Sequence, residues 1–443
     1  MLPDSLRTEL AAVPGLRLFT QPEELERFSR DAYDYSPVLQ KRLARCRAEL
    51  VVRPDTVEAV LCVAAACKRH AVPLTLRGSG TGNYGQSVPL QSGVVMLMTQ
   101  LRAVRSIEQA SGVAVVESGC LLKDLNRELS GFGRQLRLMP STWRSATIGG
   151  FIAGGSGGIG SVRWGFLRDP GHLLGLEVVT MDEEPRVLQL EASDAEALNH
   201  AYGTNGIITA LRLATAISVD WQEVVVDCPD WRTAVDLAKR CSSAAIDLHL
   251  CTVLEAAVVQ LLPSWDLPQR SADRLLLLLA PDAVSTVQRL ASDVGAELTH
   301  LGSEADRHGS GLRELSWNHT TLHLRQRDPE WTYLQMLLPQ PEIPCLETLK
   351  QSWGDDLLWH LEGVRQQGAQ RIAALPLVRW RGEEALEQLM QQCRDLGALI
   401  FNPHVLTVEG GGLGVVDADQ VAAKHRFDPT GLLNPGKLGG VSN

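Results

Sequence analysis

The stretch from Arg77 to Gly85 reads RGSGTGNYG and constrains the fold more than any other part of the chain. Four glycines fall within these nine residues, directly after the apolar run from Val72 to Leu76. Glycine tolerates positive φ and leaves no Cβ between the backbone and a ligand. Consecutive main-chain N–H groups in such a loop can form a concave site for an anion. The sequence therefore predicts a strand that leads into a phosphate cradle, and a tight surface turn is the alternative.

A second glycine-rich region covers residues 146–160 and holds five glycines between Gly154 and Gly160. This density disfavours a helix. A segment of this kind is expected where the backbone passes close to a ligand.

Both glycine regions contain the spacing G-x-G-x-x-G, which in nucleotide-binding proteins needs a helix after it. The first match, at Gly80, is followed by Gln86-Ser87-Val88-Pro89, which does not open a helix, and no acidic residue occurs from 78 to 107. The second match, at Gly155, is followed by Gly165 and Pro170-Gly171, which interrupt any crossover helix. The sequence thus argues against a Rossmann dinucleotide site.

Composition narrows the classes of function. The 443 residues are enough for two or three domains, and the net charge of −10 argues against a nucleic-acid partner. The nine cysteines form no Cys-x-x-Cys pair, so we expect neither a zinc site nor an iron–sulfur cluster in this chain. The first residues lack the pattern of a signal peptide, and the longest aliphatic run, 275–279, is too short for a transmembrane segment. We expect a cytoplasmic protein, with peripheral membrane association left open.

Hydrophobic periodicity predicts a parallel β-α-β unit near the N-terminus and an antiparallel sheet after residue 220. Residues 48–52, a helix that starts after Asp55, and residues 72–76 form a β-α-β unit, so the two strands should be parallel. After residue 220, strands at 224–226, 275–279 and 296–301 alternate with helices. This pattern favours an open antiparallel sheet with helices on one face.

Five motifs in this order carry a resemblance to a known family: residues 73–89, residues 146–150 (ATIGG), Trp164-Gly165 with Arg168-Asp169, residues 206–209 (GIIT) and residues 428–437 (DPTGLLNPGK). The chain resembles the FAD-linked oxidases with a vanillyl-alcohol-oxidase (PCMH) type of FAD domain. The glycolate oxidase and D-lactate dehydrogenase flavoprotein subunits are the nearest type.

The resemblance implies an α+β fold, with a two-subdomain FAD-binding domain and an antiparallel α+β substrate (cap) domain. We expect a helical lead-in over residues 1–44, the FAD domain over 45–220, the cap domain over 221–416, and a C-terminal segment, 417–443, that returns to the FAD site.

The resemblance also implies which residues bind FAD. These are Arg77, Gly78, Ser79, Gly80, Thr81, Gly82 and Asn83 at the diphosphate; Pro140, Ser141, Ser145, Ala146, Thr147 and Gly150 along the flavin; Gly154, Gly157 and Gly158 at close backbone approach; Ile207 and Ile208 through main chain; and Asn434 and Lys437 at the isoalloxazine edge.

Some relatives attach the flavin covalently to a histidine beside the first glycine loop. No histidine lies between His70 and His172, and Cys120 is expected to be a buried apolar thiol. We therefore expect noncovalent FAD.

The implied reaction is oxidation of a small 2-hydroxy acid such as glycolate or D-lactate, with hydride transfer to the N5 atom of the flavin. Relatives of this type bind a divalent metal through H-x-G-D-G-N-x-H and a following Glu-His-Gly. The region here, residues 400–412, keeps His404 and Glu409 but lacks the Asp-Gly-Asn core, and Gly410 replaces the second motif's histidine. We therefore expect no metal site.

Other residues could take over the missing chemistry. His319 and His323 are four residues apart, on one face of a helix, and with His404 they are the predicted catalytic residues. Arg325 and Arg379 are predicted carboxylate anchors. A small hydroxy acid and an electron acceptor, either a quinone or an iron–sulfur partner protein, are the expected partners. The alternatives are an oxidase or dehydrogenase of another alcohol or sugar acid, and a flavin-binding subunit of a glycolate oxidase complex without its own active site.

Overall fold

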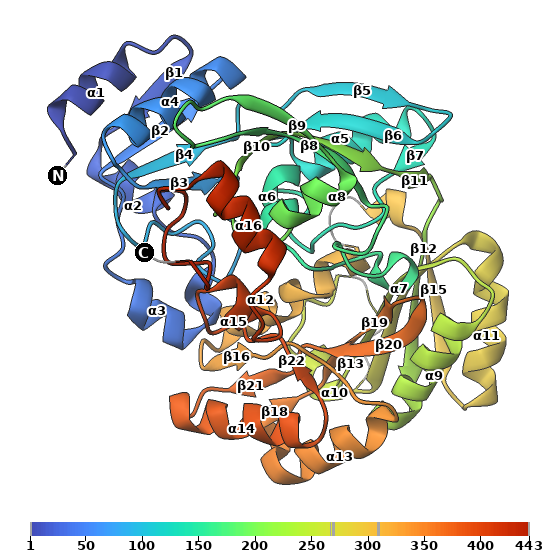
Figure 1. The fold of residues 1–443 in the computed structure, drawn as a ribbon. Coiled ribbons are helices and arrows are strands. Elements are labelled where there is room, and N and C mark those ends of the chain that lie inside the picture. Colours follow the sequence, from blue (N-terminus) through green and yellow to red (C-terminus); the bar gives the residue numbers. More distant parts are fainter. Residues whose placement is uncertain (1, 266, 268–270, 308–310, 442–443) are drawn as a thin grey trace.

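The computed structural model describes residues 2–265, 267, 271–307 and 311–441. Its strands form sheets of four, five and eight strands, with two smaller sheets of two and three strands. In Figure 1 the four- and five-stranded sheets make the upper part of the molecule and the eight-stranded sheet lies below them. Mixed helices and mostly antiparallel sheets make this an α+β fold, as expected.

The four-stranded sheet has the strand order β1-β2-β4-β3. Its elements are α1 (Asp4–Ala11), β1 (Leu16–Phe19), α2 (Pro22–Phe28), η1 (Tyr33–Tyr35), α3 (Pro37–Leu43), β2 (Leu50–Pro54), α4 (Val57–Arg69), β3 (Leu74–Arg77) and β4 (Val94–Leu97). Strands β2 and β3 both pair in parallel with β4, which lies between them. The predicted β-α-β unit is therefore confirmed, and Arg77 is the last residue of β3.

The lead-in is not wholly helical. Strand β1 pairs antiparallel with β2, from Leu16 opposite Pro54 to Phe19 opposite Val51. The expectation of helix alone over residues 1–44 is wrong here, because the buried strand β2 offers β1 a hydrogen-bonding edge that the local sequence does not reveal.

The five-stranded sheet has the order β5-β6-β10-β8-β9 and is antiparallel. The elements of this part are β5 (Val104–Glu108), β6 (Val113–Glu117), α5 (Leu122–Ser130), β7 (Arg134–Gln135), α6 (Ile148–Gly154), α7 (Ser161–Trp164), β8 (Leu173–Val179), β9 (Val187–Glu191), α8 (Ala192–Ala195), η2 (Glu196–Leu198), β10 (Ile207–Ala214) and β11 (Ala216–Ile217). The second glycine-rich region thus begins as helix α6, and it is irregular only from residue 155 to residue 160.

The eight-stranded sheet is antiparallel, in the order β15-β12-β14-β13-β19-β20-β17-β22. Its part of the chain holds β12 (Gln222–Cys228), α9 (Trp231–Ser243), β13 (Leu248–Leu254), α10 (Ala256–Val259), β14 (Asp273–Leu279), η3 (Pro281–Ala283), α11 (Val284–Asp293), β15 (Glu297–Ser303), η4 (Glu304–Arg307), η5 (Leu312–Leu315), α12 (Asn318–Arg327), β16 (Trp331–Tyr333), β17 (Met336–Leu337), α13 (Glu342–Trp353), η6 (Gly354–Asp356), β18 (Leu357–Leu358), β19 (His360–Gln366), β20 (Ala369–Ala374), β21 (Leu377–Arg379), α14 (Glu383–Asp395) and β22 (Leu399–Ile400).

The leucine run of β14 explains how this sheet is placed. Leu275, Leu277 and Leu279 pack in one core with helices α9, α11, α13 and α14. Leu276 and Leu278 point to the other face, because side chains alternate along a strand, and they share a core with the five-stranded sheet. One face of the large sheet is thus covered by helices and the other packs on the part of the molecule that carries the glycine-rich regions.

The C-terminal segment returns to the first sheet. Helices α15 (Val408–Gly411) and α16 (Ala418–Phe427) precede it. The N–H of Leu74 donates to Leu432 O at 2.8 Å, and the N–H of Asn434 donates to Leu74 O at 2.8 Å. Figure 1 shows this red segment beside β3.

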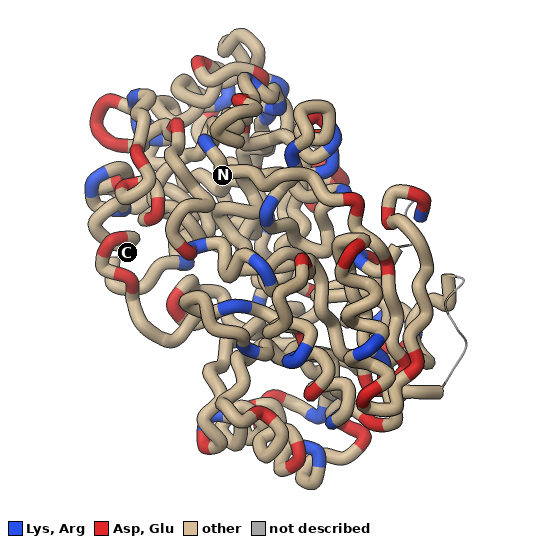
Figure 2. Tube along the Cα trace, turned by 90° about the vertical axis from the view of Figure 1, so that its right-hand side faces the viewer, with Lys and Arg blue, Asp and Glu red and all other residues tan. Residues whose placement is uncertain are grey.

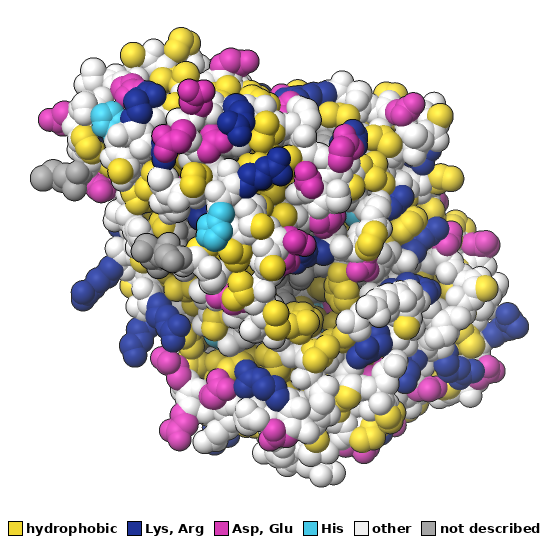
Figure 3. Space-filling view, viewed as in Figure 1, with side chains coloured by type: hydrophobic (Ala, Val, Ile, Leu, Met, Phe, Trp, Pro, Cys, Tyr) yellow, Lys and Arg dark blue, Asp and Glu magenta, His cyan; other side chains and the backbone are white. Residues whose placement is uncertain are grey.

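Lys and Arg residues are interspersed with Asp and Glu residues along the Cα trace (Figure 2). A hollow near the centre of the face in Figure 3 is edged by hydrophobic side chains. Over the described ranges, the structure has no helix that is both long and apolar enough to cross a bilayer.

Candidate functional site

A cavity brings the two glycine-rich regions together. Its wall contains residues 76–84, 86, 87, 140–142, 146, 147, 149–151, 153–158, 200, 202, 203, 206 and 208, with Tyr35, Met98, Ser118, Trp317, Asn318 and Gln335. Most of the predicted FAD-binding residues lie in this wall: Arg77, Gly78, Ser79, Gly80, Thr81, Gly82, Asn83, Pro140, Ser141, Ala146, Thr147, Gly150, Gly154, Gly157, Gly158 and Ile208.

The first glycine loop presents unpaired donors to this cavity. Within the described part of the chain, the main-chain N–H groups of residues 79–83 have no protein acceptor. Residues 79–82 are half-buried, and Gly80 has a φ of 74°, a conformation that side chains other than glycine rarely adopt. A row of free N–H groups in a concave loop fits the anion site that the sequence predicts.

The side chain of Arg77 is committed to the loop itself. Its guanidinium donates to Arg30 O, to Ser87 Oγ at 3.2 Å and to Ser79 O at 3.4 Å. A Cβ on Gly80 would collide with this guanidinium. Arg77 therefore shapes the cradle, and the donors that remain for a ligand are the main-chain N–H groups and the hydroxyls of Ser79 and Thr81.

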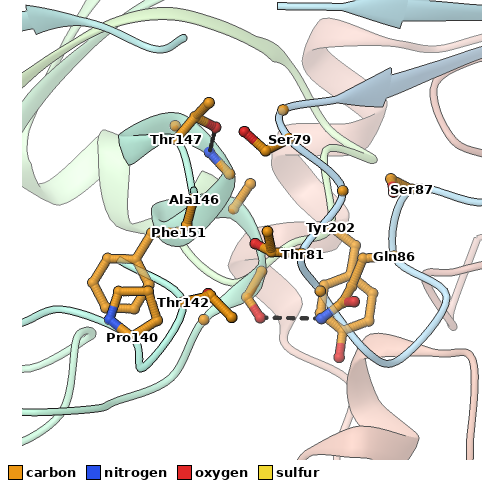
Figure 4. A pocket seen from close by; sticks show the side chains of 18 of the residues that line it. Ser79, Thr81, Gln86, Ser87, Pro140, Thr142, Ala146, Thr147, Phe151 and Tyr202 are labelled. Carbon is orange, nitrogen blue, oxygen red and sulfur yellow. Dashed lines mark hydrogen bonds between the residues drawn. The ribbon is translucent and has the colours of Figure 1, made fainter. Parts of the chain in front are cut away.

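Helix α6 begins directly against this loop. Thr147 caps it, and its Oγ1 accepts from the N–H of Gly150 at 3.2 Å. A Cβ on Gly78 would run into the same hydroxyl, so the glycine is required for the close approach. Figure 4 shows Thr147 and Ser79 on facing sides, and the amide of Gln86 donating to Gly154 O, at 3.3 Å.

The irregular stretch after α6 closes another side of the cavity. Met139 and Ile159 exchange main-chain hydrogen bonds of 3.1 and 2.9 Å, which hold Pro140 and Ser141 against the glycines. A Cβ on Gly158 would collide with the carbonyl of Met139. The sequence predicted that the backbone passes close to a ligand at these glycines. At Gly158 the structure shows close approach to another segment of the protein, and the approach to a ligand stays a prediction.

Two buried hydroxyl groups in the wall lack a partner among the described residues. They are Ser118 Oγ and Tyr202 OH. A buried polar group without a hydrogen bond costs about 1–3 kcal/mol, so such groups indicate a polar ligand. Free N–H groups for a diphosphate, glycine surfaces for close contact and orphaned hydroxyls for ring or ribose atoms all fit FAD.

A row of hydrogen-bonded polar side chains closes one part of the wall, and these residues were not predicted from the sequence. The hydroxyl of Tyr84 donates to Gln335 Oε1 at 2.8 Å, and Gln335 Nε2 lies 3.5 Å from Asn318 Oδ1. Asn83 Nδ2 donates to Tyr333 OH at 2.6 Å. Burial raises the pKa of the Tyr84 phenol well above its usual value, so it remains a neutral hydrogen-bond donor.

The backbone is strained at Trp317, next to these hydrogen-bonded side chains. Trp317 has a φ of 50°, unusual for a bulky residue, and its N–H donates to Glu362 Oε1 at 2.8 Å. Glu362 is buried and also accepts from Thr252 Oγ1 at 2.7 Å and lies 2.8 Å from His360 Nε2. The buried pair of Glu362 and His360 holds Trp317 at the start of α12, where Trp317 and Asn318 line the cavity.

His200 is the histidine that lines the cavity, and it was not predicted. Its Nδ1 lies 2.9 Å from Gly155 O and its φ is 58°. Burial lowers the pKa of His200 to about 4, so the ring is neutral near pH 7. No spacing in the sequence indicated this residue.

The predicted catalytic histidines lie outside the described wall. His319 and His323 do share one face of α12, as the spacing predicted, but the face turns to Glu314: His319 Nδ1 is 3.1 Å from its carboxylate and His323 Nε2 is 2.8 Å from its carbonyl oxygen. His404 is buried between Ser36 Oγ, at 2.7 Å, and Tyr333 O, at 2.9 Å. Their catalytic role stays a prediction that no contact with the cavity supports.

Four predicted cofactor residues also fall outside the described wall: Ser145, Ile207, Asn434 and Lys437. Ser145 is exposed and Ile207 is buried in β10. Asn434 and Lys437 lie behind the first glycine loop and hold its carbonyls. Their contact with an isoalloxazine edge stays a prediction.

The predicted carboxylate anchors point away from the cavity. Arg325 donates to the carbonyls of Trp331, Pro329 (3.0 Å) and Asp34 (2.7 Å). Arg379 pairs with Asp328 at 3.1 Å and Glu330 at 3.2 Å. Glu409 accepts from the N–H of Gly439 at 3.0 Å. The described residues contain no group of three or more His, Cys, Asp and Glu side chains arranged to hold a metal ion.

Comparisons with known proteins agree with an FAD site in this cavity. Residues 48–188 match the family model described as FAD binding domain. The chain is 23% identical over 479 residues to the glycolate oxidase subunit GlcD of Escherichia coli (strain K12), covering 98% of this chain and 92% of that protein. It is 24% identical over 450 residues to the D-lactate dehydrogenase of Archaeoglobus fulgidus, covering 92% and 95%.

The fold is also known. The structure of an alkyldihydroxyacetonephosphate synthase superposes with a TM-score of 0.75 at 15% identity, covering 99% of this chain and 86% of that one. Together with the cavity between the glycine-rich regions, these similarities show that the chain is an FAD-dependent oxidoreductase and that it carries an FAD-binding domain similar to the vanillyl-alcohol-oxidase (PCMH) type.

Proposed function

We propose that the protein oxidises a small 2-hydroxy acid such as glycolate or D-lactate, using noncovalent FAD. The observation that carries the proposal is the composition of one cavity. The glycine-rich regions that fit FAD share its wall with Trp317, Asn318 and Gln335, which come from the part of the chain that bears the large sheet. A small molecule beside Asn318 and Gln335 would share the cavity with the bound flavin. The names of the relatives support the choice of substrate class.

When bound, FAD supplies the two-electron redox chemistry. The chain's own residues bind and orient the substrate. Gln335 and Asn318 offer amide donors for carboxylate or hydroxyl oxygens, and Tyr84 keeps Gln335 in place through its 2.8 Å hydrogen bond. His200, a neutral imidazole in the wall, is the side chain we assign to accept a hydrogen bond from the substrate hydroxyl and orient it.

The described wall offers no free positive charge to a carboxylate, and this favours a second function, the oxidation of a neutral alcohol or a sugar. Among the described lining residues, Arg77 is the one lysine or arginine, and its guanidinium is bound to the glycine loop. A carboxylate substrate would therefore be held by neutral donors alone. The remaining alternative is a flavin-binding subunit without its own active site. Such a protein should oxidise no alcohol.

The variant Gln335→Glu separates these functions. It keeps the acceptor for Tyr84 and adds a negative charge to the wall. Repulsion of a carboxylate should raise KM for a 2-hydroxy acid at least about tenfold, equivalent to about 1.4 kcal/mol. The KM for a neutral diol should change little.

Steady-state kinetics with glycolate and with ethylene glycol measure this difference. Gln288→Glu is the matched control, because it adds the same charge at an exposed position of α11. Equal KM for glycolate in the wild type and in Gln335→Glu would contradict the placement of the substrate. Turnover of the diol alone would establish the second function.

A further inference from the structure

The side of the first glycine loop that faces away from the cavity is held by the C-terminal segment. Lys437 is fully buried, and its Nζ donates to the carbonyl oxygens of Gly85, Gln86 and Val88 at 2.7, 2.8 and 2.6 Å. An ammonium group has three N–H donors. All three therefore bind carbonyls of this one turn, which directly follows the unpaired N–H groups of residues 79–83.

Asn434 connects the same turn to another part of the wall. Its Nδ2 donates to Gln86 O at 2.8 Å and to Tyr202 O at 2.6 Å. Gln86 and Tyr202 both line the cavity, whereas Asn434 itself does not. Asn434 also has a φ of 39° and pairs through its N–H with Leu74 O, so its amide is placed by the backbone of β3.

An N-terminal segment completes the support. The carboxylate of Asp31 accepts from the N–H of Ser87 at 3.2 Å and from the N–H of Tyr33 at 3.2 Å. The N–H of Ala32 donates to Gly82 O at 2.8 Å. Two carbonyls of the loop, those of Gly82 and Gly85, and the turn that follows it are thus bound by residues close to both ends of the chain.

We propose that Asp31, Asn434 and Lys437 are positioning residues for FAD. They form an outer clamp that fixes the conformation in which the N–H groups of residues 79–83 point into the cavity. Coupling between two sites is reciprocal. Docking of residues 434–437 should therefore strengthen FAD binding, and FAD should in turn hold residues 434–437 in place. The inference depends on the FAD site and is independent of the substrate.

The variant Lys437→Met tests the clamp, because it keeps an unbranched side chain and removes the three donors. Lys41→Met is the matched control, since the side chain of Lys41 is 83% exposed and lies outside the described cavity wall. Apoprotein is titrated with FAD, and the dissociation constant is read from flavin fluorescence. The expected result is an affinity at least tenfold weaker for Lys437→Met, with Lys41→Met unchanged. A folded Lys437→Met with a dissociation constant within twofold of the wild type would overturn the proposal.

Hydrogen exchange on the wild-type protein provides a second measurement that does not depend on a variant folding. Amide exchange of residues 432–438 is compared with and without FAD. The clamp requires slower exchange of this segment in the FAD-bound protein, although it does not contact the cavity. Unchanged exchange in residues 432–438, with slower exchange confined to the cavity wall, would refute the coupling. The visible circular dichroism of flavin bound to Lys437→Met adds a signature that a loss of global stability alone does not change.

Discussion

Both ring nitrogens of His404 form hydrogen bonds within the protein. The Nε2–H donates to Tyr333 O, so Nδ1 is left to accept from the Ser36 hydroxyl. Burial lowers the pKa of His404 to about 4, from an ordinary value of 6.5. A histidine in this position is neutral at working pH and joins segments near residues 36, 333 and 404.

This environment predicts a pH dependence of stability. A depressed pKa in the folded state contributes stability that is complete above about pH 6.5 and is lost as the pH falls toward 4. The contribution is about 3 kcal/mol over this range, from about 1.4 kcal/mol per pH unit. His404→Gln should be less stable than the wild type at pH 7.5, and the difference should shrink as the pH falls to 4.5. Urea unfolding at several pH values measures both, and parallel curves for the two proteins would contradict the assignment.

The histidines of α12 show what spacing alone can predict. His319 and His323 were expected on one face of a helix, and the structure has them there, with ring centroids 6.3 Å apart. Which way that face turns depends on Glu314, which comes from a separate turn of the chain. The same holds for Gln335 and His200, which reach the cavity through tertiary packing and carry no local pattern.

At the scale of elements, the contact between the first glycine loop and α6 is the sharpest feature. Gly78 lies against the hydroxyl of Thr147 that caps α6. The loop was predictable, because glycine density is a local signal. The helix start was not predicted, because the same density disfavoured a helix in this region, and Thr147 nevertheless caps α6. The mutual position of the two segments was known only through the family resemblance.

Gly78→Ala tests this contact. The added Cβ should displace Thr147 from its cap and separate the two sides of the cavity, so FAD affinity should fall about tenfold or more, at least about 1.4 kcal/mol. Gly131→Ala is the control, because Gly131 lies at the end of α5 with a φ of −62°, which alanine adopts without strain. Flavin fluorescence titration measures both variants. If Gly78→Ala retains FAD as well as Gly131→Ala does, the two segments do not enclose the cofactor.

The C-terminal segment was expected to reach the isoalloxazine edge. In the structure, Asn434 and Lys437 donate to the carbonyls of Gln86 and Gly85, and neither is among the described residues that line the cavity. Sequence motifs indicate that a segment returns to the site, but not on which side of the loop it lies. That side is decided by the edge of β3, where Leu432 and Asn434 pair with Leu74.

At the scale of the whole molecule, the large sheet builds the site as well as the second core. One face of β14 packs under helices, and the other packs on the part that carries the flavin cavity. The unbroken run of five leucines, 275–279, is typical of a strand that is buried on both faces, whereas the sequence pattern predicted helices on one face only. Nothing in the sequence indicated that this packing would bring Trp317 and Gln335 into one wall with the glycine-rich regions, because that arrangement joins segments that are far apart in the chain.

The most direct test of the central claim is anaerobic reduction of the purified holoprotein. The visible absorbance of the bound flavin is followed while glycolate, D-lactate and ethylene glycol are added separately. Full bleaching by a 2-hydroxy acid, and little by the diol, is the result that the proposed function predicts. An oxidised spectrum that persists with every hydroxy acid would contradict it.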